Sequence, residues 1–154
     1  MMSQNVGFHK LGIAPWLVEK LKEVGITEPT EVQRAAVPPI LEGKNVIVQS
    51  PTGTGKTLAY LAPLLTKINT ATKDLEVLIL VSSRELAMQV FRQLREVADN
   101  IGAVSLIGGA NPARQLEALK EKPKLAVGTP GRIAELLQKR KINGQAVRAI
   151  VVDE

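Results

Sequence analysis

Short apolar segments alternate along the chain with longer segments in which apolar residues recur at helical spacing. Five short segments are rich in valine, isoleucine and leucine: Asn45–Gln49, Val77–Val81, Val104–Ile107, Leu125–Val127 and Ala149–Val152. They are almost wholly apolar rather than alternating with polar residues, which is typical of parallel strands covered on both faces. The pattern therefore predicts a buried, mainly parallel sheet.

Helices are predicted between and before these strands. In the clearest helical pattern, apolar residues recur at spacings of three and four: Leu86, Val90, Leu94, Val97 and Ile101. Two further helices are expected near residues 15–24 and 30–41. This order predicts an α/β fold with right-handed crossovers and helices on both faces of the sheet. Ligands of such sheets bind where strands end and helices begin.

Composition removes several classes of chemistry. The 154 residues suffice for one domain with a sizeable core. The absence of cysteine and the single histidine, His9, exclude disulfides, thiolate catalysis, cysteine-ligated zinc and histidine-based triads. No apolar run approaches the roughly 20 residues of a membrane span, and the N-terminus lacks the features of a secretory signal. A cytoplasmic domain without a membrane partner is expected.

The charge balance leaves room for a polyanionic partner. Twenty basic residues against 15 acidic ones give a formal net charge of +5, which permits such a partner without requiring one. The aromatic residues are Phe8, Trp16, Tyr60 and Phe91, too few for a base-stacking platform. If nucleic acid binds, contacts to its sugar-phosphate backbone should therefore dominate.

A glycine-rich segment follows the first predicted strand and reads Gln49-Ser50-Pro51-Thr52-Gly53-Thr54-Gly55-Lys56-Thr57. Its glycines let backbone N–H groups face a phosphate chain, and the next helix adds the partial positive charge of its N-terminus. Lys56 is expected to reach the β- and γ-phosphates and the Thr57 hydroxyl to bind Mg²⁺. Ser50 stands where the general phosphate-loop pattern has its first glycine.

Two carboxylates, Asp153 and Glu154, directly follow the last predicted strand. Asp153 is expected to bind the Mg²⁺ shell, and Glu154 to act as general base on the attacking water. Alone, two acids at a strand end are more simply solvated surface residues. The presence of Lys56 and Thr57 favours the functional interpretation.

With these elements placed, the chain resembles the N-terminal half of a DEAD-box RNA helicase core, the first of its two RecA-like domains. In that family a small residue such as Ser50 replaces the first glycine, and the final Val-Asp-Glu matches the start of the Asp-Glu-Ala-Asp motif. The resemblance implies an adenine-reading segment at 1–43, and at 44–154 the P-loop core of a RecA-like domain that is incomplete at its C-terminus. It implies catalytic roles for Lys56, Asp153 and Glu154.

Residues 25–33 (GITEPTEVQ) resemble the adenine-reading glutamine motif of the family, and Phe8 stands where the family carries an isolated aromatic residue. The Gln33 amide can pair with adenine N7 and N6, and Phe8 can cover a face of the base. Thr30-x-x-Gln33 is also a capping-box pattern, and both roles are compatible. The implied nucleotide contacts are Phe8, Thr27, Gln33, Ser50, Thr52, Gly53, Thr54, Gly55, Lys56 and Thr57.

Three later strand-to-helix junctions resemble the RNA-contacting motifs of the family. The segment 83–89 (SRELAMQ) resembles Pro-Thr-Arg-Glu-Leu-Ala-x-Gln, although Ser82 and Ser83 replace the Pro-Thr pair. Ser82-x-x-Glu85 is expected to form a capping box there. The other two junctions carry a glycine doublet and an unchanged Thr-Pro-Gly-Arg, in which the threonine can cap a helix.

Each of these junctions taken singly is more simply an ordinary helix start with a solvated arginine. All three are expected on one edge of the sheet, where free N–H groups and arginines can face phosphates. The implied contacts to the RNA backbone are Arg84, Gly108, Gly109, Thr129, Pro130, Gly131 and Arg132.

The family core continues with Ala-Asp, a Ser-Ala-Thr motif and a second RecA-like domain, which the sequence lacks. The Ser-Ala-Thr strand lies between the strands of the phosphate loop and Asp153, so the resemblance implies a truncated chain with two open strand edges. Such edges favour strand exchange or aggregation. The intact protein is expected to separate short RNA duplexes with ATP. The 154-residue chain is expected to bind ATP and RNA weakly, with negligible ATPase activity.

Two other function classes remain open. One is a different P-loop enzyme, such as a GTPase or a transporter ATPase, although the chain has no Asn-Lys-x-Asp and no Leu-Ser-Gly-Gly-Gln sequence. The other is an RNA- or partner-binding module whose nucleotide site is not catalytic. Competition between nucleotides distinguishes the first class from a helicase, because Gln33 predicts that ATP binds in preference to GTP. The substitution Lys56→Ala distinguishes the second class from a helicase.

Overall fold

The structure is a computed structural model that describes residues 7–109 and 111–154. The chain divides into two compact units, Met1–Lys67 and Ile68–Glu154. Among the residues described, the first unit holds only helices, and the second holds helices and strands.

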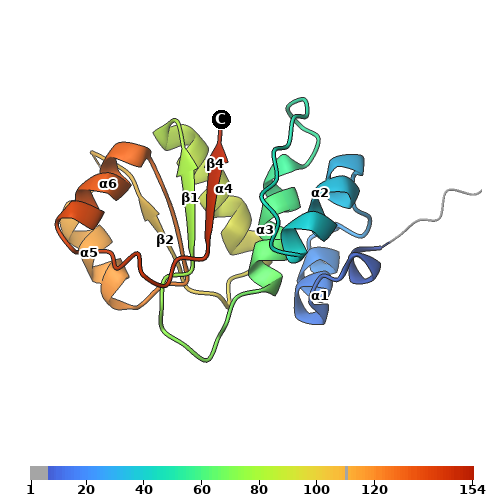
Figure 1. Cartoon of the computed structure of the whole chain (residues 1–154), viewed down its shortest axis with the longest axis horizontal. Coiled ribbons are helices and arrows are strands. Elements are labelled where there is room, and N and C mark those ends of the chain that lie inside the picture. Colours follow the sequence, from blue (N-terminus) through green and yellow to red (C-terminus); the bar gives the residue numbers. More distant parts are fainter. Residues whose placement is uncertain (1–6, 110) are drawn as a thin grey trace, which may run out of the picture. The chain divides into compact units, whose positions relative to one another are not determined.

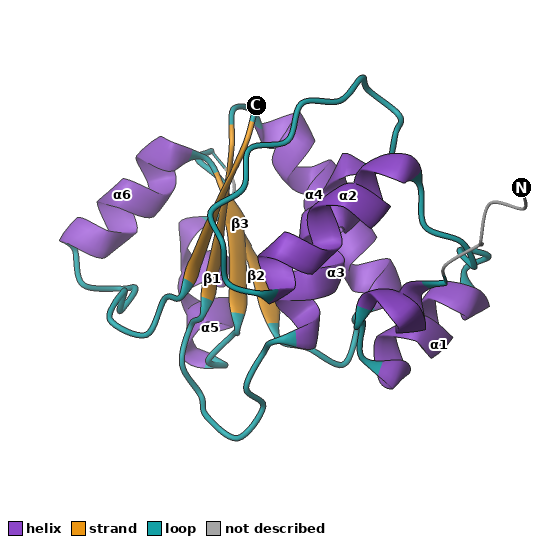
Figure 2. Cartoon of the chain, turned by 45° about the vertical axis from the view of Figure 1, so that its right-hand side comes forward, coloured by secondary structure: helices purple, strands orange, loops and turns teal. Residues whose placement is uncertain are grey.

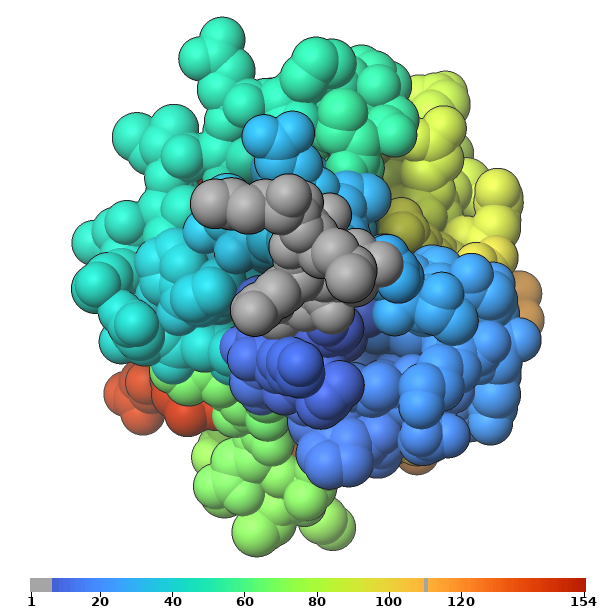
Figure 3. Space-filling view, turned by 90° about the vertical axis from the view of Figure 1, so that its right-hand side faces the viewer, coloured from blue at the N-terminus to red at the C-terminus, as the bar shows by residue number. Residues whose placement is uncertain are grey.

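The N-terminal unit is helical. A short 3-10 helix, η1 (Phe8–Leu11), precedes α1 (Pro15–Glu23), α2 (Glu31–Leu41) and α3 (Lys56–Thr66) (Figure 1). Leu17, Leu21, Val37 and Leu61 have no exposed surface and lie in its core. In Figure 3 the residues of η1, α1 and α2 are coloured blue to cyan. The two helices predicted near 15–24 and 30–41 are confirmed.

The strand predicted at Asn45–Gln49 is wrong. Residues 44–51 form neither strand nor helix, and the side chains of Ile47 and Val48 are 99% and 39% exposed. A strand is stable only where a neighbouring strand takes its backbone hydrogen bonds. No strand of the described ranges, 7–109 and 111–154, pairs with this segment. Its apolar composition is therefore not enough to make it a strand here.

The C-terminal unit is built on a parallel sheet, as predicted. Its strands are β1 (Val77–Val81), β2 (Ala103–Leu106), β3 (Leu125–Gly128) and β4 (Ala149–Asp153), in the spatial order β2-β3-β1-β4. Every neighbouring pair is parallel, and Figure 2 shows the strands in orange. All four strands match their predicted positions to within one residue at each end.

Helices cover both faces of this sheet. α4 (Arg84–Val97) packs against β1, β2 and β3 on one face. α5 (Pro112–Lys120) and α6 (Pro130–Gln138) cover the other face, where their apolar residues join Leu78, Leu106 and Ala126 in one cluster (Figure 1). Because strand side chains alternate in direction, Val77, Ile79 and Val81 point to the opposite face from Leu78. In the described part of the chain, no helix is long and apolar enough to span a membrane.

β4 lies at one edge of the sheet. Ile150 and Val152 are 62% and 74% exposed, so the prediction that this strand is buried on both faces is wrong. Among the residues described, β4 pairs with β1 alone, and only alternate side chains are partly covered. An edge strand of this kind presents unpaired N–H and C=O groups along its free side.

Candidate functional site

The phosphate loop, residues 50–57, leads directly into α3. Gly53 and Gly55 have φ angles of +83° and +89°, a left-handed conformation that residues with a side chain rarely adopt. Gly55 is the N-cap residue of α3, and no side chain caps this helix. The first N–H groups of α3 are therefore free of a capping side chain at the end of the loop, as an anion-binding helix start requires.

Hydroxyl groups stabilise the loop from within. Thr54 Oγ1 donates to the Pro51 carbonyl at 2.7 Å and lies 2.5 Å from Ser50 Oγ. Since the single hydroxyl hydrogen of Thr54 is used for Pro51, Ser50 must donate to Thr54. Ser50 thus has a contact within the loop that the glycine of the general pattern could not make. Thr52 is exposed in the turn.

Lys56 is the first residue of α3 and is half-buried. Within the described residues its ammonium group takes part in no hydrogen bond or ion pair. Thr57 follows it in the first helical turn. A lysine without a protein partner, beside free N–H groups at a helix start, is suited to hold a phosphate.

Gln33 connects α2 to the phosphate loop. Its Oε1 accepts from the Thr30 N–H at 2.9 Å, and its own N–H donates to Thr30 Oγ1 at 3.4 Å, which confirms the capping box. Its Nε2 also donates to the Gly55 carbonyl at 3.1 Å. A Cβ atom on Gly55 would lie 2.5 Å from this nitrogen, so the contact requires glycine there. The local sequence does not reveal it, because the two residues are 22 positions apart.

Two further predicted nucleotide contacts, Phe8 and Thr27, precede α2 in the chain. Phe8 is only 2% exposed and lies in the core of the N-terminal unit. Stacking of this ring on adenine remains a prediction, and it requires the ring to become uncovered. Thr27 is exposed in the segment between α1 and α2.

Parallel pairing brings the carboxyl ends of the four strands to one edge of the C-terminal unit. Leu80 is opposite both Gly128 and Val152, and Leu106 is also opposite Gly128. The predicted RNA contacts follow β1, β2 and β3, and the two acids end β4. The structure therefore brings to this edge Arg84, Gly108, Gly109, Thr129, Pro130, Gly131, Arg132, Asp153 and Glu154.

Arg84 lies against the glycine doublet that follows β2. Gly109 has a φ of +77°, and a Cβ atom on it would be 3.0 Å from Arg84 Nη1. The N-cap of α4 is Ser83, whose Oγ accepts from the Leu86 N–H at 3.1 Å. The predicted Ser82 capping box is wrong by one residue, because the helix begins at Arg84. The observed cap places this arginine in the first turn, next to the loop.

Gly128 is required by the close approach of two strands. A Cβ atom on it would collide with the Leu106 carbonyl oxygen and would lie 3.1 Å from Ile133 Cδ1. Thr129 is the N-cap residue of α6 with Pro130 after it, as predicted, but its hydroxyl makes no capping bond. Its backbone instead links β2 to α6. The Thr129 N–H donates to the Leu106 carbonyl of β2 at 3.3 Å, and the Thr129 carbonyl accepts from the Ile133 N–H of α6 at 3.1 Å. The start of α6 thus has no side-chain cap.

Arg132 is held by two side chains. Its Nε donates to Gln115 Oε1 at 3.0 Å, and its Nη1 lies 3.1 Å from Glu135 Oε2. Hydrogen bonds from Lys139 and Arg132 hold the pKa of Glu135 below its ordinary value of 4.5. Gln115 was not predicted as a site residue, although a glutamine among the apolar positions of a short helix is a signal that its amide has an internal partner.

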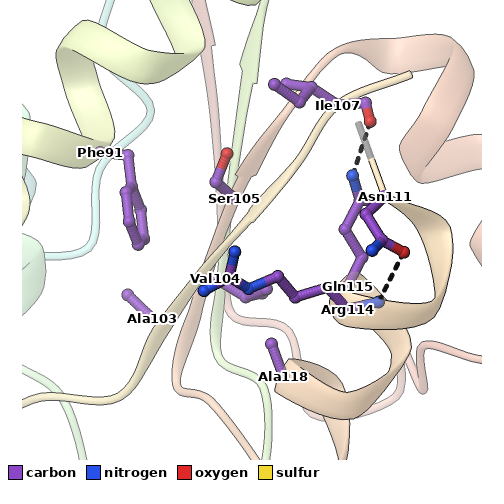
Figure 4. A pocket seen from close by; sticks show the side chains of 9 residues that line it. All are labelled: Phe91, Ala103, Val104, Ser105, Ile107, Asn111, Arg114, Gln115 and Ala118. Carbon is purple, nitrogen blue, oxygen red and sulfur yellow. Dashed lines mark hydrogen bonds between the residues drawn. The ribbon is translucent and has the colours of Figure 1, made fainter. Parts of the chain in front are cut away.

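A cavity of about 340 Å³ opens beside β2. Figure 4 shows its lining, with Phe91 from α4 on one side. On the other side lie Asn111, directly before α5, and Arg114 and Gln115 within α5. Asn111 caps α5, since its Oδ1 accepts from the N–H groups of Ala113 and Arg114 at 3.1 and 3.3 Å. The cavity wall therefore includes the same Gln115 that holds Arg132.

The predicted metal ligands and acids lie at element ends. Asp153 is the last residue of β4, opposite Val81, and Glu154 follows it exposed. The described residues hold no cluster of three side chains of the metal-ligating kinds. A Thr57 hydroxyl and an Asp153 carboxylate are nevertheless oxygen ligands of the kind that Mg²⁺ uses when phosphates supply the others. They belong to different units of the chain.

Comparison with known proteins identifies the family of the chain. The sequence profile of the family described as DEAD/DEAH box helicase matches residues 30–154. The chain is 48% identical over 142 residues to DEAD-box ATP-dependent RNA helicase CshC of Bacillus cereus, covering 91% of this chain and 36% of that protein. It is 45% identical over 141 residues to the probable ATP-dependent RNA helicase YfmL of Bacillus subtilis, covering 90% and 38%.

A plant relative is similar as well. The chain is 42% identical over 167 aligned positions to the mitochondrial DEAD-box ATP-dependent RNA helicase 47 of Arabidopsis thaliana, covering 96% of this chain and 30% of that protein. The chain thus spans about a third of the length of these relatives. The profile match covers the phosphate loop, the three later junctions and the closing acids. By this match and these relatives, the chain belongs to the DEAD/DEAH box helicase family.

Proposed function

We propose that this chain is the ATP-binding RecA-like part of an ATP-dependent RNA helicase, which separates short RNA duplexes locally. The observation that carries the proposal is the phosphate loop. Left-handed Gly55 immediately precedes α3, and the ammonium group of Lys56 has no partner among the residues described. The similar proteins are named ATP-dependent RNA helicases, which supports ATP and RNA as the ligands of this chain.

In this proposal Lys56 and the loop N–H groups hold the β- and γ-phosphates. Thr57 and Asp153 hold the metal ion, Mg²⁺, through oxygen atoms. When bound, ATP with Mg²⁺ would supply the phosphoanhydride bond whose hydrolysis is coupled to the separation of RNA duplexes. The Glu154 carboxylate accepts the proton of the attacking water. Gln33 pairs with the base beside the loop that it already contacts through Gly55.

The proposed RNA surface is the carboxyl edge of the sheet, with Arg84, Gly108–Gly109 and Thr129–Arg132. Support comes from their common edge, from the contact of Arg84 with Gly109 and from the uncapped start of α6. The excess of positive charge and the scarcity of aromatics favour contacts to phosphates over base stacking. We expect binding with little preference for base sequence.

The nucleotide part is tested by titrating a fluorescent ATP analogue into the chain, with ATP and GTP as competitors. Replacing Lys56 by alanine should weaken binding by about tenfold or more, because a charge-assisted contact to phosphate is lost. Lys22→Ala is the matched control, since Lys22 pairs with Glu19 on the surface of α1. Equal displacement by GTP would favour a different P-loop enzyme over the helicase.

The non-enzymatic alternative is separated by Lys56→Ala in a longer protein that contains this chain. The helicase proposal expects loss of RNA-stimulated ATPase and of duplex separation. Unchanged biological activity together with unchanged RNA binding would show that the nucleotide site is not catalytic.

A further inference from the structure

We infer that Gln115 is a positioning residue of the proposed RNA surface, which holds the Gly108–Gly109 loop and the first turn of α6 in one arrangement. The inference rests on the proposed function, because the surface that it concerns is the proposed RNA surface. Gln115 lies in α5 and is only 7% exposed.

Both ends of the Gln115 amide are used. Its Nε2 donates to the Ile107 carbonyl at 2.7 Å, the bond drawn in Figure 4, and its Oε1 accepts from Arg132 Nε at 3.0 Å. Ile107 directly precedes the glycine doublet, and Arg132 lies in the first turn of α6. One buried side chain therefore ties the end of β2 to the start of α6.

The state of Arg132 supports a positioning role. Its side chain is only 11% exposed, and Glu135 also pairs with it at 3.1 Å. The guanidinium group is therefore fixed by Gln115 and Glu135, and its charge is already paired within the protein. Its contribution to RNA binding comes through the position of the α6 N-terminus, whose N–H groups have no side-chain cap.

The chemistry of the bridge calls for an amide. The Ile107 carbonyl can only accept a hydrogen bond, and the Arg132 guanidinium can only donate one. Gln115 supplies the donor and the acceptor together. A carboxylate at position 115 would face the Ile107 carbonyl without a donor, and an apolar side chain would leave both partners unpaired.

Positioning matters here because the loop is made of glycine. A Cβ atom at Gly108 would meet nothing within 4 Å, and Gly109 has a left-handed φ of +77°. Glycine has wider backbone freedom than any residue with a side chain. Fixing this loop before RNA binds lowers the conformational entropy lost on binding. The hydrogen bond from Gln115 to Ile107, the residue directly before Gly108, holds the start of the loop in place.

The test measures the affinity of the 154-residue chain for a fluorescein-labelled single-stranded oligouridylate by fluorescence anisotropy at low salt. Gln115→Met keeps the side-chain size but removes both hydrogen bonds. Arg132→Lys keeps the charge but loses the guanidinium fork. Each should weaken binding about three- to tenfold. The double variant should bind the oligouridylate with about the same affinity as the single variant that binds less tightly. The control Gln138→Met, at an exposed residue of α6, should bind it as tightly as the unchanged chain does.

A second readout follows the bridge directly. In nitrogen-15 NMR spectra the Nε–H signal of Arg132 should exchange slowly with water in the unchanged chain and rapidly in Gln115→Met. The amide signals of Gly109 and Gly131 should shift when RNA is added to the unchanged chain, and less so in Gln115→Met. If Gln115→Met does not fold in a thermal melt, Arg132→Lys and the exchange of Arg132 Nε–H in the unchanged chain decide the matter.

The outcomes separate this inference from the function on which it rests. Unchanged RNA affinity of folded Gln115→Met, or of Arg132→Lys, overturns the positioning role, and so do additive effects of the two substitutions. Rapid exchange of Arg132 Nε–H in the unchanged chain overturns it as well. If Arg84→Ala weakens RNA binding while Gln115→Met does not, the proposed function survives without the inference. If the unchanged chain binds no RNA, both fail.

Discussion

The two ends of the same four parallel strands use their polar residues in opposite ways. Before the amino ends of β1, β3 and β4 stand Glu76, Lys124 and Arg148, and Lys124 Nζ lies 3.1 Å from Glu76 Oε2. Arg148 pairs with the other Glu76 oxygen, while Glu76 and Lys124 are 3% and 7% exposed. At the carboxyl ends the chain instead has glycines, helix starts and exposed backbone.

The amino-terminal cluster is closed on itself. Burial alone would raise the pKa of Glu76, but hydrogen bonds from Lys124 and the Asn69 N–H, together with the charge of Arg148, outweigh it and hold the pKa below 4.5. Lys124 also donates to Thr72 Oγ1 at 2.7 Å. A group that already has its partners has little to offer a ligand. The comparison teaches that this edge contributes stability, whereas the opposite edge keeps donors available for binding.

The largest effect is expected from Glu76→Ala. The substitution leaves the buried ammonium of Lys124 with Thr72 as its remaining hydrogen-bond partner. Breaking a buried ion pair from one side costs about 3–5 kcal/mol of unfolding free energy. Urea denaturation followed by circular dichroism measures the change.

The matched control for this prediction is Glu117→Ala. Glu117 pairs with Lys120 on the exposed face of α5, where an ion pair contributes little. RNA affinity of folded Glu76→Ala should equal that of the unchanged chain. If both substitutions lowered stability equally, the cluster would not stabilise the amino-terminal edge as described.

A smaller loss of stability is expected from Gly128→Ala at the carboxyl edge. The new methyl group would meet the backbone oxygen of Leu106, which cannot rotate away, so the cost should be about 2 kcal/mol. Gly131→Ala is the control, because a Cβ there meets nothing within 4 Å and alanine favours a helix. Thermal melts compare them, and equal melting temperatures would show that β2 and β3 can move apart at no cost.

Acid should weaken the chain partly through Glu76. Its pKa is lower in the folded state than its ordinary value of 4.5, so it binds protons more readily when the chain is unfolded. The stabilisation it gives is present above pH 4.5 and is lost as the pH falls through the folded pKa. Urea midpoints measured across this range should fall less steeply in Glu76→Gln. An identical acid profile for the two chains would rule out this contribution.

The smallest effect should come from Glu135→Gln. It removes a negative charge beside Arg132 while Gln115 continues to hold that arginine. Affinity for single-stranded RNA should rise by no more than about twofold at low salt. The control Glu96→Gln changes the net charge by the same amount at an exposed position of α4. If its RNA affinity rose by a similar factor, the effect would come from the total charge of the chain rather than from the charge beside Arg132.

Local patterns predicted most of this fold. β1 is found where its apolar run places it. Thr30 is the N-cap residue of α2, as predicted, because the capping box is a contact between residues three apart. The segment 45–49 has three consecutive apolar residues but forms no strand, since a strand also needs a neighbour that local sequence does not reveal. For the same reason the exposure of Ile150 was not foreseen.

The candidate site was predictable in part. The glycines and Lys56 follow from spacing, because a phosphate loop is local in sequence. The contacts from Gln33 to Gly55 and from Gln115 to Arg132 were not predicted, since they join residues 22 and 17 positions apart. Motif matching locates residues that meet a ligand more readily than residues that hold them in place.

The charged cluster at the amino ends also has a consequence for the order of folding. The charged partners of Glu76 are Lys124 and Arg148, which lie 48 and 72 positions later in the chain. Because long loops close slowly, these ion pairs form late in folding. A sheet with its strands in the wrong order would bury the Glu76 carboxylate without Lys124 and Arg148, at a high electrostatic cost. The cluster therefore discriminates against wrong strand pairings late in assembly. In stopped-flow experiments Glu76→Ala should speed unfolding more than it slows refolding.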